Sequence, residues 1–179
     1  MEKSVRQGDL GGFAQSENNL SQEGACWLFQ NAIAAEDAVV AENAQIRNLA
    51  VLRGNTMVVG NAIIRDCSIV EDYAIVTTGV VEGNSRIAGN ARIIRNEWTQ
   101  ATPRVADSLV YGEISGNLCL TAGAQVLPGQ AFHNPTPDEL RITEADRKIL
   151  RTPERESAQL APPEGWEPAK KKTRSQPER

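Results

Sequence analysis

The single histidine, His133, is the residue of this chain best suited to general acid–base chemistry. Imidazole titrates closer to neutral pH than other unperturbed side chains, so His133 is the candidate catalytic base. It stands in the segment Ala131–Pro137, outside any repeat, and the sequence shows neither a Ser–His–Asp set nor a phosphate-binding loop. A catalytic zinc site needs about three protein ligands, which one histidine cannot supply. We therefore expect no metal and no cofactor, and the sequence favours a protein that is not an enzyme.

The three cysteines indicate a reducing compartment. Cys26, Cys67 and Cys119 are odd in number, far apart and without CxxC spacing, which argues against a disulfide framework or a zinc site. Cys67 is predicted to face the interior and to be inert. The N-terminus has no apolar signal region, and no stretch approaches the length of about 18 apolar residues that a membrane span requires. We expect a cytoplasmic protein that does not contact membranes.

A six-residue repeat dominates the middle of the chain. A small residue recurs at Ala32, Ala38, Ala44, Ala50, Thr56, Ala62, Ser68 and Ala74. An aliphatic residue follows two positions later, at Val40, Ile46, Leu52, Val58, Ile64, Val70 and Val76. An α-helix would place its apolar residues about every 3.6 positions, and antiparallel hairpins would show turn signals about every 8–12. Period six therefore predicts a hexapeptide β-helix, an all-β fold.

Three hexapeptides make one triangular coil of 18 residues, so residues 18 apart should stack on one face. The predicted stacks are Val40, Val58 and Val76; Ile46 and Ile64; and Ala34, Leu52 and Val70. After Val76 the repeat loses one residue, and Val81, Ile87 and Ile93 continue the same faces. About five coils, at roughly 4.8 Å each, predict a short prism.

Polar residues are predicted at the corners and on the outer faces. The Asn or Asp before each small residue, as at Asn43 and Asn61, fits a corner that needs a left-handed backbone. Arg53 lies 18 residues before Glu71, and Arg65 lies 17 before Glu82. We expect exposed ion pairs there, each worth about 0–1 kcal/mol.

The residue between the small and aliphatic positions should point outward, and it is often apolar. Val39, Met57 and Ile75 share one predicted face, and Val51 and Ile69 share another. Because large exposed apolar patches mark interfaces, we expect at least one of these faces to be buried in a homo-oligomer, a dimer or a trimer. Further predicted contact residues are Trp98, Tyr73, Glu71 and Asp72.

The ends of the chain depart from the repeat. Residues 1–30 are predicted to form an N-terminal cap in which Phe13, Trp27 and Phe29 plug the first coil. The β-helix spans 31–130, with a loop insertion near 95–106. Residues 131–151 form a C-terminal cap with a short helix, because Thr143–Asp146 resembles a capping box. Residues 152–179 are rich in Pro, Glu, Lys and Arg and are predicted to be a disordered tail.

The segment Gly11–Trp27 carries the motif GGF-x5-NLSQ-x-G-x-CW. With the repeats, it resembles bacterial and prophage hexapeptide-repeat proteins over about residues 8–95. Val40–Gln45 fits the family pattern [LIV]-[GAED]-x-x-[STAV]-x. The resemblance implies a left-handed parallel β-helix and a phage-associated role, and no specific activity. Acyltransferases share this fold, which implies trimers with an acyl donor bound between prisms.

The charge distribution bears on partners. Residues 1–130 hold 9 Lys and Arg against 14 Asp and Glu, a net charge of −5, which disfavours nucleic acid except at the basic run 170–174. The sequence favours a non-catalytic protein-binding or scaffold protein, for instance an acidic inhibitor of a host defence complex. The alternatives are an acyltransferase-like enzyme and a structural virion component.

Overall fold

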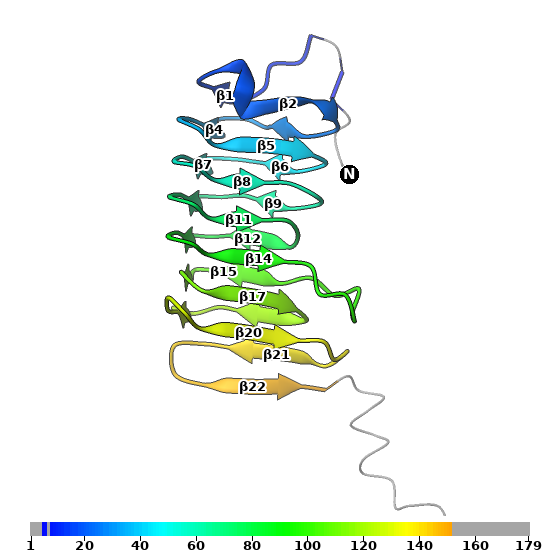
Figure 1. Cartoon of the computed structure of the whole chain (residues 1–179), viewed down its shortest axis with the longest axis vertical. Coiled ribbons are helices and arrows are strands. Elements are labelled where there is room, and N and C mark those ends of the chain that lie inside the picture. The colour runs from blue at the N-terminus through cyan, green and yellow to red at the C-terminus, as the bar shows by residue number, and fades with distance from the viewer. Residues whose placement is uncertain (1–4, 7, 152–179) are drawn as a thin grey trace, which may run out of the picture.

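The computed structural model describes residues 5–6 and 8–151 and shows a narrow prism of stacked strands (Figure 1). Each coil contributes one strand to each of three sheets, here called A, B and C, which are parallel except for the last strand of sheet C. Except at the two ends, each strand pairs with its equivalent one coil earlier and one coil later, so the backbone bonds run along the prism axis. The fold is the left-handed parallel β-helix that the repeat predicts.

The strands are short and follow one another around the prism. Sheet A contains β1 (Phe13–Ala14), β4 (Ile33–Ala34), β7 (Val51–Leu52), β10 (Ile69–Val70), β13 (Arg86–Ile87), β16 (Leu109–Val110) and β19 (Gln125–Val126). Sheet B contains β2 (Leu20–Gly24), β5 (Val39–Glu42), β8 (Met57–Val58), β11 (Ile75–Val76), β14 (Arg92–Ile94), β17 (Glu113–Gly116) and β20 (Ala131–Asn134). Sheet C contains β3 (Trp27–Leu28), β6 (Gln45–Ile46), β9 (Ile63–Ile64), β12 (Val80–Glu82), β15 (Arg104–Ala106), β18 (Leu118–Leu120), β21 (Glu139–Ile142) and β22 (Arg147–Leu150). A single 3-10 turn, η1 (Glu17–Asn19), is the helical element of the described residues.

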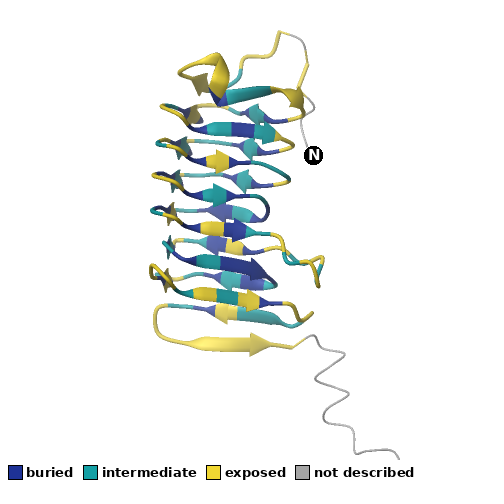
Figure 2. Ribbon diagram, in the orientation of Figure 1, coloured by how far each residue is buried: buried dark blue, intermediate teal, exposed yellow. Residues whose placement is uncertain are grey.

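The predicted register is confirmed. Val40 pairs with Val58, which pairs with Val76 in sheet B. The one-residue deletion after Val76 is also confirmed, because Ile64 pairs with Val81 at a spacing of 17. Side chains at these inward positions and at the small-residue positions are buried (Figure 2). The interior is therefore filled by Ala, Val, Ile and Leu, with Thr56, Ser68, Ser85 and Ser108 at some small-residue positions, which explains a fold with so few aromatic residues.

At the corners of the central coils the left-handed residue lies one position earlier than predicted, whereas Gly79 and Asp107 are left-handed at the predicted position. Positive φ angles occur at Glu36, Glu42, Asn48, Gly54, Gly60, Asp66 and Asp72, immediately before the expected Asn or Asp positions. The following polar residue has another role, since the Asn43 amide donates to Asn61 Oδ1 of the next coil at 3.3 Å. In the central coils the sequence pattern thus identified the corners but assigned the strained backbone to the wrong residue.

The N-terminal segment is built differently from the predicted plug. Phe13 is 63% exposed, and Trp27 and Phe29 are half-buried on the outside, because strand alternation turns them away from the axis. Leu28 and Asn19 occupy the interior at this end. The Asn19 Nδ2 donates to the carbonyl oxygens of Glu36 (2.9 Å) and Ala38 (2.8 Å), so a buried amide satisfies backbone acceptors at the open coil.

Sheets A and B each contain seven strands within the described residues, so the solenoid is longer than the predicted five coils. The extra coils lie at both ends, where backbone pairing continues although the sequence repeat fades. The predicted helix after Thr143 is wrong: β21 and β22 form an antiparallel hairpin. The Asp146 N–H donates to Thr143 Oγ1 at 3.0 Å, the bond expected of a capping box, but here it closes a turn. The predicted tail, 152–179, lies outside the described residues.

Candidate functional site

The outer face of sheet A carries a continuous apolar column. Phe13, Ile33, Val51 and Ile69 are in register on four consecutive strands and point away from the core. Phe13 and Ile33 are exposed, Val51 and Ile69 are half-buried, and exposed Leu49 lies at the adjoining corner. The sequence predicted Val51 and Ile69 as contact residues, and the structure adds Phe13, Ile33 and Leu49. We call these five residues the sheet A patch.

The sheet B column contains Val39, Met57 and Ile75, also in register. Met57 is exposed, whereas the other two are half-buried. The column then becomes charged, since Ile75 pairs with Arg92 and Arg92 with Glu113. Sheet A therefore presents more exposed apolar surface than sheet B.

The other predicted contact residues do not gather at one place. Tyr73 is exposed at the corner between sheets A and B, where the neighbouring Asp72 accepts the Gly89 N–H at 2.8 Å. Trp98 is 83% exposed and lies on the loop after β14, at the opposite end of the sheet B strands. Asp72 is thus a corner residue, and Trp98 is an isolated aromatic.

Glu71 and Glu82 are buried carboxylates, so the prediction of exposed surface pairs is wrong for them. Only 4% of Glu71 and 7% of Glu82 is exposed. Glu71 accepts hydrogen bonds from Arg53, at 2.8 Å, and from Arg86. Glu82 accepts from Arg65 at 2.9 Å and Arg104 at 2.6 Å. Each carboxylate therefore joins three successive coils, which makes Glu71 a structural residue.

Glu82 should make stability depend on pH. Burial alone would raise the pKa of its carboxyl, but the hydrogen bonds and charges of Arg65 and Arg104 outweigh burial and lower that pKa. A lowered folded-state pKa stabilises the protein above the unfolded pKa, and this contribution is lost as pH falls through the folded value. We expect Glu82→Gln to lower the unfolding free energy by about 1–3 kcal/mol at pH 7.

Urea denaturation at a series of pH values checks this expectation. The wild type should lose stability more steeply than Glu82→Gln below about pH 4.3, the ordinary glutamate value. Glu23→Gln, at an exposed position, is the control and should match the wild type. Parallel pH profiles for the wild type and Glu82→Gln would contradict the assignment.

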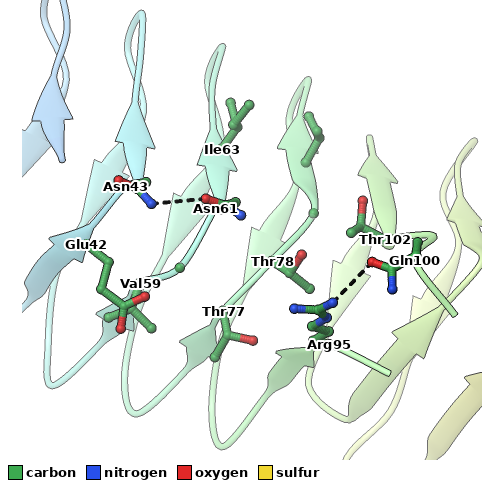
Figure 3. Close-up of a pocket in the computed structure, with 13 residues that line it drawn as sticks. Glu42, Asn43, Val59, Asn61, Ile63, Thr77, Thr78, Arg95, Gln100 and Thr102 are labelled. Carbon is green, nitrogen blue, oxygen red and sulfur yellow. Dashed lines mark hydrogen bonds between the residues drawn. The ribbon is translucent and has the colours of Figure 1, made fainter. Parts of the chain in front are cut away.

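A groove of about 660 Å³ lies at the corner between sheets B and C, beside the loop that follows β14 (Figure 3). Its lining is mainly polar and includes Glu42, Asn61, Thr77, Thr78 and Arg95. Arg95 donates to Gln100 Oε1 at 3.1 Å, and this bond braces the loop. The groove offers hydroxyl and amide groups along several coils, a lining that suits polar ligands without specifying one.

Three polar side chains meet on the outer face of sheet B in the last two coils. The Ser115 Oγ lies 2.8 Å from the Nδ1 of His133, and the His133 Nε2 lies 3.6 Å from a Glu113 oxygen. Asn96, at the start of the loop, donates from Nδ2 to Ser115 Oγ at 3.3 Å. His133 belongs to a regular strand, β20, and not to an irregular segment. The spacing of 18 between Ser115 and His133 is the signal that sequence analysis missed.

The cysteines occupy three different environments. Cys67 is exposed, which contradicts the inward prediction, because the neighbouring Ser68 takes the interior position. Cys26 is buried, and burial raises the pKa of its thiol. Cys119 is half-buried, and burial likewise raises its pKa. Within residues 5–6 and 8–151, no group of three or more His, Cys, Asp or Glu side chains is arranged to hold a metal ion.

The part of the chain that the structure describes contains no helix with the length and hydropathy of a transmembrane span. Comparisons with models of known protein families and with curated proteins gave no match for this chain.

Proposed function

We propose that this protein is a protein-binding scaffold that self-associates through the outer face of sheet A. The observation that carries the proposal is the sheet A patch, whose residues line up on four consecutive coils and include three exposed large apolar side chains. Scattered exposed apolar residues are normal, but a contiguous patch on a flat, rigid surface is typical of an interface.

The partner that fits this face is a second copy of the chain, lying alongside with its axis parallel. In that two-fold arrangement each residue of the apolar column meets its own equivalent, as in isologous interfaces. Arg86, which follows Ile69 in the column, would face its own copy, and it shares the Glu71 carboxylate with Arg53. A parallel arrangement therefore joins the apolar residues and places two Arg86 side chains near each other, each of them ion-paired with Glu71.

The size of the face is compatible with such a dimer. Seven strands about 4.8 Å apart and a side of about six residues give a surface roughly 30 Å by 20 Å. This area of about 600 Å² is close to the roughly 800 Å² that each partner buries in a specific interface. Contact along the whole sheet is needed to reach that size.

Light scattering coupled to gel filtration tests the proposal. We expect the wild type to have twice the monomer mass of 19.4 kDa, and Ile33→Asp with Val51→Asp to be monomeric. Met57→Asp with Ile75→Asp places the same charge on sheet B and should leave the dimer intact. A monomeric wild type, a trimer, or equal disruption by the sheet B variant would overturn the proposed face.

A cysteine placed in the column tests the orientation. In a Cys67→Ser background, Val51→Cys should form a disulfide with its own copy on mild oxidation, because parallel packing brings the two positions together. Leu109→Cys, on the same face two strands beyond Ile69, should do the same. Antiparallel packing about the patch would link position 51 and leave position 109 unlinked.

A further inference from the structure

The cluster of Glu113, Ser115 and His133 follows directly from strand geometry. On β17, the core residue Ile114 separates Glu113 from Ser115, so both of these side chains point outward. The pairing of β17 with β20 places His133 directly beside Ser115. The loop after β14 then brings Asn96 to the Ser115 hydroxyl. Four groups with different chemistry therefore converge from three consecutive coils.

Ser115 differs from the other buried serines of the solenoid. Ser85 Oγ donates to the carbonyl oxygen of Glu82 at 2.6 Å, and Ser108 Oγ donates to that of Ala106 at 2.7 Å. These hydroxyl groups satisfy backbone carbonyl acceptors. The Ser115 hydroxyl instead meets an imidazole nitrogen, although only 3% of the residue is exposed. The bond therefore places a sheltered hydroxyl against the one side chain of the chain that can act as a neutral base.

The imidazole is placed to accept the serine proton. Glu113 lies on the Nε2 side of the ring, where its carboxylate favours the tautomer that carries the proton on Nε2. In this tautomer Nδ1 has a free lone pair and accepts the Ser115 O–H. The 3.6 Å separation between a Glu113 oxygen and His133 Nε2 is longer than a hydrogen bond, and catalytic contacts of this kind often tighten when substrate binds.

We propose that Ser115 is the nucleophile of an ester-hydrolysing site in which His133 is the general base and acid. Glu113 is the positioning residue, and the Asn96 amide is a donor to the oxyanion. A hydroxyl, a base that touches it, a group that orients the base and an amide donor make up the set required for acyl transfer through a covalent intermediate.

The reaction balances with water as the second substrate. His133 Nδ1 takes the proton of Ser115 Oγ as that oxygen bonds to the ester carbonyl carbon. Collapse of the tetrahedral adduct breaks the ester C–O bond, and the alcohol leaves with the proton from Nδ1. Water then attacks the acyl-serine, His133 takes one water proton, and the carboxylic acid leaves as that proton returns to Ser115 Oγ.

The surroundings indicate the class of ester. A groove of about 440 Å³ borders Glu113 and includes Arg92, Gln130 and Ala131. Arg92 lies 3.6 Å from the Glu113 carboxylate. The lining of this groove does not include Ser115 or His133, so the groove would hold the part of the substrate beyond Glu113. Because only 3% of Ser115 is exposed, a short acyl group on an exposed alcohol fits better than a long hydrocarbon chain. The proposed substrates are esters of short carboxylic acids.

Labelling of the full chain with a fluorophosphonate tests the nucleophile, and peptide mass spectrometry locates the adduct. We expect a stoichiometric adduct on Ser115, absent from Ser115→Ala and from His133→Ala. Ser108→Ala removes another buried hydroxyl and should label like the wild type. No adduct on Ser115 in the wild type would overturn the proposal, as would labelling that survives His133→Ala.

Hydrolysis of p-nitrophenyl acetate distinguishes a mechanism through an acyl-serine from simple catalysis by an exposed histidine. We expect a burst of one nitrophenol per chain in the wild type and at least a roughly 100-fold loss of rate in Ser115→Ala and His133→Ala. Glu113→Gln should lower kcat by about ten-fold or more with KM unchanged, and Glu113→Asp should restore part of it. Circular dichroism establishes that each variant is folded. A Ser115→Ala rate within two-fold of the wild type would overturn the proposal.

Discussion

Replacing Ile64 with alanine will lower the free energy of unfolding by about 2–5 kcal/mol. Ile64 is fully buried on β9 and stacks between Ile46 and Val81. Three aliphatic rows, one from each sheet, fill the narrow interior, and the backbone pairing between coils holds the strands in place, so the space left by Ile64 cannot close. A cavity in the middle of the stack also weakens the contact between the coils on either side, on which a solenoid depends.

The adjacent residue supplies a matched control. Ile63 has the same side chain on the same strand but points outward and is half-buried. Ile63→Ala should cost less than about 1 kcal/mol, since it leaves no internal cavity. Urea denaturation followed by circular dichroism measures both variants. Equal losses at positions 63 and 64 would show that the inward and outward assignments are wrong.

Replacing Gly60 with alanine will lower the free energy of unfolding by about 2–5 kcal/mol, because the alanine is strained in its backbone and its Cβ atom is too close to the next coil. Gly60 has a φ of +65°, which costs an L-residue about 1–2 kcal/mol. A Cβ atom at this position would also lie closer than 3.0 Å to the carbonyl oxygen of Thr77 in the next coil. That oxygen belongs to the backbone and cannot move without breaking the pairing between coils.

Gly89→Ala is the control that separates the cost of the backbone angle from the cost of overpacking. Its φ of +63° is nearly the same, but an added Cβ would make only ordinary contact, at 3.5 Å, with the ring of Tyr111. Gly89→Ala should therefore lose only the conformational cost, about 1–2 kcal/mol. Thermal unfolding of both variants under one buffer condition measures the difference. A loss at position 89 as large as that at position 60 would mean that the backbone angle, and not the close approach of coils, sets the requirement for glycine.

The repeat determined the central part of this fold. Small and aliphatic residues at fixed phases of a six-residue period specify which side chains face the axis, and a slip of one residue would expose the whole core row. For this reason the stacks through Val58, Ile64 and Leu52 could be predicted before the structure was known, including the deletion after Val76. The outward apolar residues followed from the same alternation.

Only the tertiary structure decided the ends of the solenoid. The first and last coils form because the backbone of a strand at the edge of a sheet pairs with another extended segment. This pairing uses backbone groups and does not require the six-residue side-chain repeat. The same bond between Thr143 and Asp146 can begin a helix or close a turn, and the open edge of β21 selects the turn. Likewise, sequence places Glu71 and Glu82 near arginines, but only packing between coils shows that they are buried.

The cluster around His133 also depends on the tertiary structure. Ser115 and His133 are 18 residues apart, but the irregular loop after β14 hides the phase of the repeat in this region. Asn96 lies 19 residues before Ser115 and reaches it because Ile94, two residues before Asn96, pairs with Ser115 in sheet B. The sequence by itself determined which residues form the core, since that information is local and periodic. The structure decided which polar groups meet, since that depends on the register of coils across an insertion.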